Sequence, residues 1–269
     1  MTPDRFQRLK RALACRQPDL TAVLDLVNKG HNVSAIMRSC DAVGILDMHA
    51  VWQPHLAQVY DAHAGGSGKW IRLFLYDSVQ EAIQGLKARG HVIVGADLQE
   101  RSIDFRDHDY TRPTAVVMGA EKYGLGEPAR RLLDGCIRIP MMGLSASLNV
   151  SVAAGLILYE AQRQRAAAGF YEQRRLDEPT YREVLFEWCY PELAGYCREH
   201  GLPYPRLGES GEVLEPVGGH DPERLRTELR KSKNNDSPGG QPPHGPERDE
   251  EPGDRRGEPR AGNDPDRER

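Results

Sequence analysis

The sequence predicts an α/β protein with a mainly parallel sheet and helices on both faces. Short apolar runs alternate with amphipathic segments of helical period from residue 20 to residue 165. The apolar runs show little polar alternation, which is typical of strands that are buried on both faces. Glycine, proline and asparagine separate the segments, as expected for repeated strand-to-helix units.

The composition limits the classes of protein to which this chain can belong. The 269 residues carry a formal net charge of −4, so any attraction to nucleic acid must come from a local basic patch. Five scattered cysteines, without a Cys-x-x-Cys pair or a neighbouring histidine ligand, predict a reduced protein with no metal site. No apolar run approaches the roughly 20 residues that span a bilayer. We therefore expect a soluble, cytoplasmic protein with no membrane partner.

The chain begins with a predicted basic helix over residues 2–15. Phe6, Leu9 and Leu13 fall on one face, and the remaining positions are rich in arginine and lysine. Next come a buried strand at 20–27, a turn, and a helix at 33–44 that ends at a glycine. A solvated charged face is the ordinary interpretation of the first helix, and contact with RNA phosphates is the functional one.

The alternation continues through the middle of the chain. Further strands are predicted at 46–52, 71–76, 91–97 and 113–118, and further helices at 54–68, 79–89 and 127–133. A long polar connection at 98–112 fits either an excursion over the sheet edge or a surface loop, and the residues do not separate these two.

A strand, a small-residue loop and a helix follow each other at 136–165. Pro140 ends the strand, and Ser147 is the predicted N-cap of the helix. A helix N-terminus offers unpaired N–H groups, and small residues let the backbone approach a ligand closely. This segment is consistent with a binding site and equally with an ordinary capped helix.

The C-terminal part predicts a helical extension and then loss of order. A helical pattern over 177–200 is interrupted at Pro191, and from Gly218 the chain is crowded with proline, glycine and charged residues. We divide the chain into a basic N-terminal helix (1–18), a catalytic domain (19–168), a helical extension (169–217) and a disordered tail (218–269).

Three polar loops follow predicted parallel strands, at residues 28–38, 118–126 and 141–149. In open α/β sheets, ligands bind at the carboxyl ends of the strands. The loops are therefore expected to meet in one crevice. No Gly-x-Gly-x-x-Gly motif is present, which argues against a dinucleotide-binding enzyme.

These loops resemble the three motifs of the SpoU-type RNA 2′-O-methyltransferases of the SPOUT class. The matching segments are residues 32–44 (NVSAIMRSCDAVG), 118–124 (MGAEKYG) and 139–153 (IPMMGLSASLNVSVA). Residues 17–20 and 202–205 extend the resemblance to members that act on tRNA. The resemblance implies a deep trefoil knot, a homodimer and a tRNA substrate.

The resemblance also implies S-adenosylmethionine as the cofactor, held largely by backbone groups. The positions that match the family's cofactor site are Ala96, Met118, Gly119, Glu121, Ile139, Met141, Ser147 and Leu148.

Catalytic and tRNA-binding roles are carried over in the same way. The implied catalytic set is Asn32, Arg38, Glu121, Ser147 and Asn149. A guanidinium with a pKa above about 12 is a poor general base, so we assign Arg38 to binding and orienting an RNA phosphate. The residues expected to bind tRNA are Arg5, Arg8, Lys10, Arg11, Arg38, Arg163 and Arg165.

Two alternatives stay open at this point. One keeps the chemistry and moves the target to ribosomal RNA, although the sequence lacks the separate N-terminal RNA-binding domain that such relatives often carry. The other is a non-catalytic RNA-binding protein built on a decayed knot, which the intact catalytic set argues against.

Overall fold

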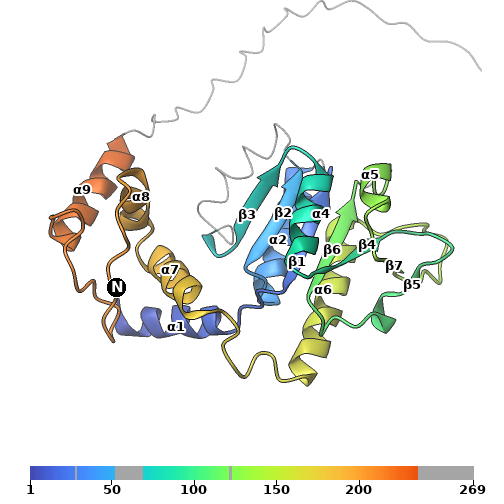
Figure 1. Cartoon of the computed structure of the whole chain (residues 1–269), viewed down its shortest axis with the longest axis horizontal. Coiled ribbons are helices and arrows are strands. Elements are labelled where there is room, and N and C mark those ends of the chain that lie inside the picture. Colours follow the sequence, from blue (N-terminus) through green and yellow to red (C-terminus); the bar gives the residue numbers. More distant parts are fainter. Residues whose placement is uncertain (28, 52–68, 121–122, 236–269) are drawn as a thin grey trace, which may run out of the picture.

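A computed structural model describes residues 1–27, 29–51, 69–120 and 123–235 of the chain. Within these residues, seven strands form one sheet in the order β3-β2-β1-β6-β4-β7-β5 (Figure 1). All the pairings between neighbouring strands are parallel, which confirms the predicted α/β class. The strands are β1 (Leu20–Asp25), β2 (Asp47–Val51), β3 (Arg72–Tyr76), β4 (Val92–Ala96), β5 (Ile103–Asp104), β6 (Thr114–Gly119) and β7 (Gly135–Arg138).

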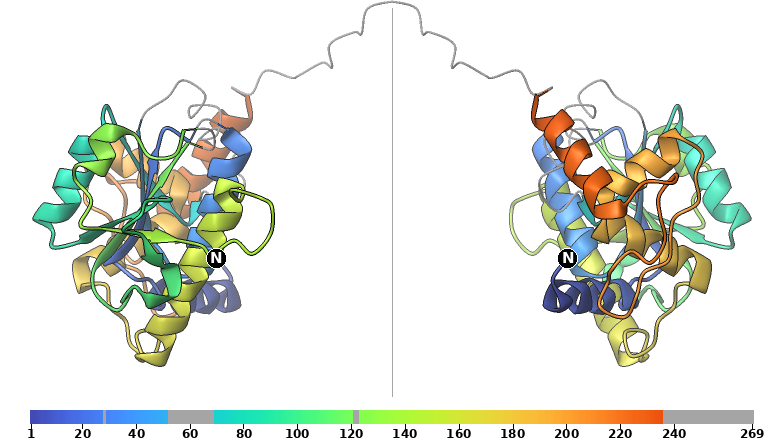
Figure 2. Two further views of the ribbon diagram at one scale, coloured as in Figure 1. Left: turned by 90° about the vertical axis from the view of Figure 1, so that its right-hand side faces the viewer. Right: turned by 90° about the vertical axis from the view of Figure 1, so that its left-hand side faces the viewer.

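Helices cover both faces of this sheet. The elements around it are α2 (Gly30–Ala42), α4 (Val79–Ala88), α5 (Glu127–Arg130), α6 (Val150–Ala167) and the 3₁₀ helix η2 (Phe105–Asp107). Figure 2 shows α2 and α6 side by side on one face, with α4 on the opposite face. The predicted helix at 54–68 lies outside the described residues.

The central strands explain why the sequence lacks polar alternation. All six residues of β1 are buried, and successive side chains point to opposite faces. Leu24 and Val116 pack into the core shared with α2 and α6, while Val23 and Val117 pack into the core shared with α4. Because both faces lie in apolar cores, every strand position favours an apolar residue.

The polar connection at 98–112 is an ordered excursion. It adds β5 to the sheet edge beside β7 and then forms η2. Tyr110 is fully buried, and its backbone N–H donates to Oε1 of Gln164 at 2.9 Å. The connection is thereby fixed against the C-terminal half of α6.

The terminal helices form a second core beside the sheet, and we call them the terminal unit (Figure 1). Its members are α1 (Pro3–Ala14), α7 (Glu178–Cys189), α8 (Pro191–Glu199) and α9 (Pro222–Asn235). Pro191 is the first residue of α8, so the predicted interruption of this helical segment is confirmed. Phe6 and Leu13 of α1 and Trp188 of α7 are buried in this core.

The prediction of disorder from Gly218 is wrong for the segment that forms α9. Leu225 is buried in the second core, with Leu229 packed against it one turn later. Arg230 Nε also lies 2.9 Å from a carboxylate oxygen of Glu192 on α8. Two leucines at helical spacing are enough to anchor the helix, although the surrounding composition is strongly polar.

No helix of the described chain is both long and apolar enough to cross a membrane.

Candidate active site

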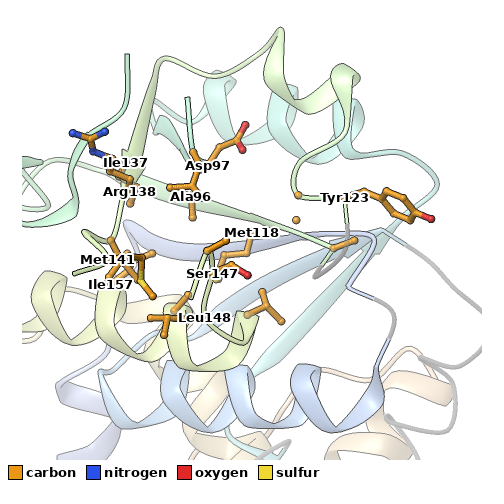
Figure 3. Close-up of a pocket in the computed structure, with 18 of the residues that line it drawn as sticks. Ala96, Asp97, Met118, Tyr123, Ile137, Arg138, Met141, Ser147, Leu148 and Ile157 are labelled. Atoms are coloured by element: carbon orange, nitrogen blue, oxygen red, sulfur yellow. The ribbon is translucent and has the colours of Figure 1, made fainter. Parts of the chain in front are cut away.

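A cavity of about 390 Å³ opens at the carboxyl ends of β4, β6 and β7 (Figure 3). Seven predicted cofactor residues line it: Ala96, Met118, Gly119, Ile139, Met141, Ser147 and Leu148. The eighth, Glu121, lies outside the described residues. Segments that are far apart in the sequence therefore meet here, as expected for the edge of a parallel sheet.

The inner part of the cavity is apolar. Met118 and Ile137 come from the sheet, and Ile157 comes from α6; all three side chains are buried. Leu148 lines the cavity from the loop before α6 (Figure 3). Such a surface suits a flat, weakly polar ring that can also accept hydrogen bonds from backbone groups.

Gly119 shapes one wall of the cavity by a close approach of two backbone segments. A Cβ at this position would lie 2.2 Å from the carbonyl carbon and oxygen of Gly124. Ala120 and Gly124 form an antiparallel bridge, in which Gly124 N donates to the Ala120 carbonyl at 2.8 Å. Gly124 has a φ of 65°, which favours glycine. Gly119 is therefore required by the close approach of the two backbone segments, and Gly124 by its positive φ.

Charged side chains line the outer part of the cavity. The Asp97 carboxylate accepts hydrogen bonds from Arg130 Nε and Gln99 Nε2, both at 2.8 Å. Partial burial raises the pKa of Asp97, but the bonds from Arg130 and Gln99 outweigh it and lower the pKa below its ordinary value. Asp97 is therefore ionised at neutral pH. Sequence reasoning missed Asp97 and Arg130, because only the fold brings the end of β4 next to α5.

Two predicted catalytic residues, Asn32 and Asn149, are in direct contact. Asn149 Nδ2 donates to Asn32 Oδ1 at 3.2 Å, and Asn149 Oδ1 accepts from Ser151 N at 2.8 Å. The N-cap of α6 is thus Asn149, and the predicted cap at Ser147 is wrong. Ser147 lies exposed in the preceding loop, two residues too early for its side chain to close the first turn.

Arg38 lies elsewhere on α2. Asn32 is buried in the first turn, whereas Arg38 is exposed to solvent farther along the same helix. Arg38 is not among the described residues that line the cavity. Its guanidinium is therefore available to a molecule that approaches from outside.

Asp25 is a further residue that the sequence analysis did not select. It ends β1, is almost fully buried, and accepts a hydrogen bond from Gly126 N at 2.8 Å. Burial raises the pKa of Asp25, although the bond from Gly126 lowers it. The contact joins the strand before the first motif to the end of the second motif loop. The available signal was an acidic residue inside the predicted buried strand at 20–27.

The predicted tRNA-binding residues divide into exposed and buried ones. Arg5, Arg8 and Arg11 are exposed on α1, and Lys10 is half-buried with its Nζ 5.5 Å from the centre of the Phe6 ring. Arg163 is exposed on α6 and pairs with Glu160 at 2.7 Å. These residues can be reached by an RNA phosphate.

The assignment of Arg165 to tRNA binding is wrong for this structure. Its side chain is 0% exposed and lies 2.6 Å from Asp19. It also donates to the carbonyls of Tyr110 and Arg112 at 2.9 and 3.1 Å. A guanidinium whose donors are engaged by buried acceptors is a structural group. The position of Arg165 on α6 turns it inward, whereas that of Arg163 turns it outward.

Two family models match successive parts of the chain. The model of the SpoU rRNA Methylase family matches residues 19–159, and that of SpoU, rRNA methylase, C-terminal, matches residues 163–216. The chain belongs to the SpoU methylase family. In this SpoU protein, the first match covers β1 to β7 and the first part of α6, and the second covers the end of α6 with α7 and α8.

Two similar proteins match most of the SpoU chain. A tRNA (guanosine(18)-2′-O)-methyltransferase of Escherichia coli K12 is 46% identical over 215 residues, which are 79% of this chain and 94% of the relative. The crystal structure of the A. aeolicus TrmH/SpoU tRNA modifying enzyme is 39% identical with a TM-score of 0.66, and the match covers 70% of this chain and 96% of that one.

A third similar protein is an AdoMet-bound rRNA methyltransferase from Sinorhizobium meliloti. It is 28% identical with a TM-score of 0.50, and the match covers 57% of this chain and 59% of that one. The shared part is therefore smaller than for the tRNA-modifying relatives.

Proposed function

We propose that this protein methylates the ribose 2′-OH of guanosine 18 in the D-loop of tRNA, with S-adenosylmethionine as the methyl donor. The observation that carries the proposal is that the second and third motif segments line one cavity, while a hydrogen bond from Asn149 to Asn32 joins the third segment to the first. The near-complete coverage of the E. coli tRNA methyltransferase supports the choice of substrate.

The cavity fits the proposed cofactor. Its volume of about 390 Å³ falls within the roughly 300–1,000 Å³ of small-molecule sites. The apolar part around Met118, Ile137 and Leu148 would hold the adenine, and the charged outer part would face the amino-acid portion. When bound, S-adenosylmethionine supplies an electrophilic methyl group on a sulfonium.

The chain's residues would orient the nucleophile. A ribose hydroxyl is a weak nucleophile and must lie in line with the methyl carbon at about 3 Å. The Asn32–Asn149 contact holds the start of α2 against the start of α6, which fixes the two motif loops relative to each other. Arg38, exposed on α2, would bind a phosphate next to the target nucleotide, and that phosphate would help to accept the hydroxyl proton.

The terminal unit would position the tRNA. Arg5, Arg8 and Arg11 present exposed guanidinium groups along α1, and contacts of this kind to phosphates orient a nucleic acid without reading its sequence. A tRNA substrate would place the protein in the cytoplasm.

A homodimer is part of this proposal. Val152, Leu156 and Tyr159 form an apolar stripe on α6, and their side chains are 51%, 44% and 54% exposed. Apolar groups that gather on one helix face mark protein interfaces. We expect Leu156→Glu to convert a dimer to a monomer in sedimentation velocity, whereas Ala167→Glu, exposed at the end of α6, should leave the dimer intact. A wild-type monomer at micromolar concentration would contradict the dimer.

The substrate is tested by incubating the protein with labelled S-adenosylmethionine and either unmodified tRNA or ribosomal RNA from cells that lack the activity. Label in the tRNA is expected, as a 2′-O-methylguanosine of the D-loop. Label found only in ribosomal RNA would favour the second candidate, a ribosomal RNA methyltransferase, which is the activity in the name of the SpoU rRNA Methylase family.

A further inference from the structure

The outer part of the cavity holds two side chains of opposite charge, Asp97 at the end of β4 and Arg130 at the end of α5. Arg130 Nε and Nη2 lie 2.8 and 3.3 Å from the two carboxylate oxygens of Asp97. A Cβ added to Gly124 would lie 3.6 Å from both side chains, so the pair borders the turn of the second motif. We call these two residues the rim pair.

The rim pair is held in place by its surroundings. The Asp97 side chain is only 9% exposed. Ser102 Oγ donates to the Asp97 carbonyl at 2.7 Å and accepts from Gln99 N at 3.0 Å, which fixes the turn after β4. Arg130 ends a helix whose preceding residue, Gly126, is bonded to the buried Asp25. Both charges are therefore positioned before any ligand arrives.

Each member of the rim pair has hydrogen-bonding capacity left. A carboxylate can accept about four hydrogen bonds. The Asp97 side chain accepts three from the side chains of Gln99 and Arg130, and Oδ1 takes only the longest of these three. A guanidinium has about five N–H donors, and Arg130 uses those of two nitrogens for Asp97. The Arg130 side chain is 37% exposed, so the remaining donors can reach a ligand.

A ligand that complements such a pair carries an ammonium and a carboxylate on one carbon. We propose that the rim pair binds the α-amino-acid group of the methyl donor, with Asp97 accepting from its ammonium and Arg130 donating to its carboxylate. This inference rests on the proposed function. The apolar inner part of the cavity cannot solvate a zwitterion, so the amino-acid group belongs at the charged end. Arg138 is a poorer candidate, because Figure 3 shows its guanidinium directed away from Asp97.

A different role for Asp97 is to bind the ribose of the donor, since carboxylates also accept hydrogen bonds from sugar hydroxyls. The two roles differ in which part of the ligand is recognised. 5′-Methylthioadenosine keeps the adenine, ribose and sulfur of the donor and lacks the amino-acid group. Comparing the two ligands therefore separates the roles.

The experiment is isothermal titration calorimetry of the full chain with S-adenosylmethionine and with 5′-methylthioadenosine. Arg130→Leu and Asp97→Asn should each weaken S-adenosylmethionine binding about tenfold or more, as expected for loss of a charge-assisted contact. Binding of 5′-methylthioadenosine should change less than about twofold. Arg130→Lys should recover part of the affinity for S-adenosylmethionine, because the positive charge is kept.

Arg131→Leu is the matched control. Arg131 follows Arg130 directly, is 75% exposed, pairs with Glu127 and does not line the cavity. This variant should bind both ligands as the wild type does.

Three outcomes would overturn the inference or its basis. Equal weakening of both ligands would assign the rim pair to the ribose or to the fold, and unchanged affinity for both would make it a structural ion pair. If Arg130→Leu unfolds, the near-isosteric Asp97→Asn still decides between these roles. A wild-type protein that binds neither ligand would contradict the proposed function instead, so the two failures are distinguishable.

Discussion

Arginine has opposite roles in the two parts of the molecule. One part is the sheet domain, which consists of β1 to β7 and the helices that cover them, and the other is the terminal unit. In the sheet domain, Arg165 is buried and ties α6 to Asp19 and to the chain before β6. On α1 of the terminal unit, Arg5, Arg8 and Arg11 are exposed. The contrast teaches that arginine content alone does not locate an RNA-binding surface. Burial separates the guanidinium groups that hold the fold from those that can meet a phosphate.

The first prediction concerns Arg38, the exposed arginine of α2 to which we assign the phosphate of the target nucleotide. Arg38→Ala should lower the methyl-transfer rate by about 100-fold or more, because positioning and charge stabilisation at a reacting centre have effects of this size. Affinity for S-adenosylmethionine should be unchanged, since Arg38 does not line the described cavity. Single-turnover kinetics and calorimetry measure the two quantities.

Arg163→Ala is the control for Arg38→Ala. Arg163 is exposed on α6, as Arg38 is on α2, but pairs with Glu160. Its loss should reduce tRNA affinity modestly and leave the single-turnover rate at saturating tRNA close to normal. A near-normal rate for Arg38→Ala would remove Arg38 from the proposed site.

The second prediction tests whether the buried Arg165 stabilises the fold. Arg165→Met should lower the free energy of unfolding by about 3–5 kcal/mol, because it leaves buried acceptors and part of the Asp19 charge without their partner. Urea denaturation followed by circular dichroism measures the change. Arg163→Met should cost less than about 0.5 kcal/mol, as an exposed substitution does. Equal effects of the two substitutions would contradict the distinction between the buried, structural Arg165 and the exposed Arg163.

The third prediction concerns α9 in the terminal unit. Leu225→Ala should destabilise the protein by about 2 kcal/mol, because Leu225 is 6% exposed in the second core. Thr227→Ala, on the same helix with its hydroxyl bonded only to the Glu223 carbonyl, should have a much smaller effect. An unchanged urea midpoint for Leu225→Ala would mean that α9 does not pack against the other helices of the terminal unit in solution.

The fourth prediction concerns the exposed arginines of α1. Replacing Arg5, Arg8 and Arg11 by glutamine should weaken tRNA binding and reduce the slope of log affinity against log salt by about 2, if most of the three contact phosphates. Filter binding at several salt concentrations measures the slope. Arg224 is 81% exposed on α9, and Arg224→Gln is the control. It should change the slope by less than the loss of one phosphate contact would. An unchanged slope for the triple variant would place the tRNA elsewhere.

Much of the sheet domain could be predicted from sequence, because strands buried on both faces leave continuous apolar runs such as that of β1. The convergence of the second and third motif loops followed from the same topology, and Met118 and Leu148 do line one cavity, as does Ala96. The loop at residues 28–38 contributes none of the described lining residues. The trefoil knot and the catalytic roles came only from the family resemblance, and they stay predictions.

The errors have a common cause. None of the three is decided by local sequence alone. The inward direction of Arg165 and the order of α9 depend on contacts with residues distant in the sequence. The cap at Asn149 depends on the residue at which α6 starts. The Asp97–Arg130 pair was missed for the same reason, since its members lie 33 positions apart. Local periodicity contains none of this information.

The measurement that tests the account most directly is methyl acceptance by tRNA transcripts that carry a single 2′-deoxynucleotide. Removing the 2′-OH of guanosine 18 deletes the proposed nucleophile and leaves every phosphate in place. We predict that this transcript takes up no label from S-adenosylmethionine but still binds, while a transcript with the same change at guanosine 19 is labelled normally. Full labelling of the 18-deoxy transcript would contradict the proposed function.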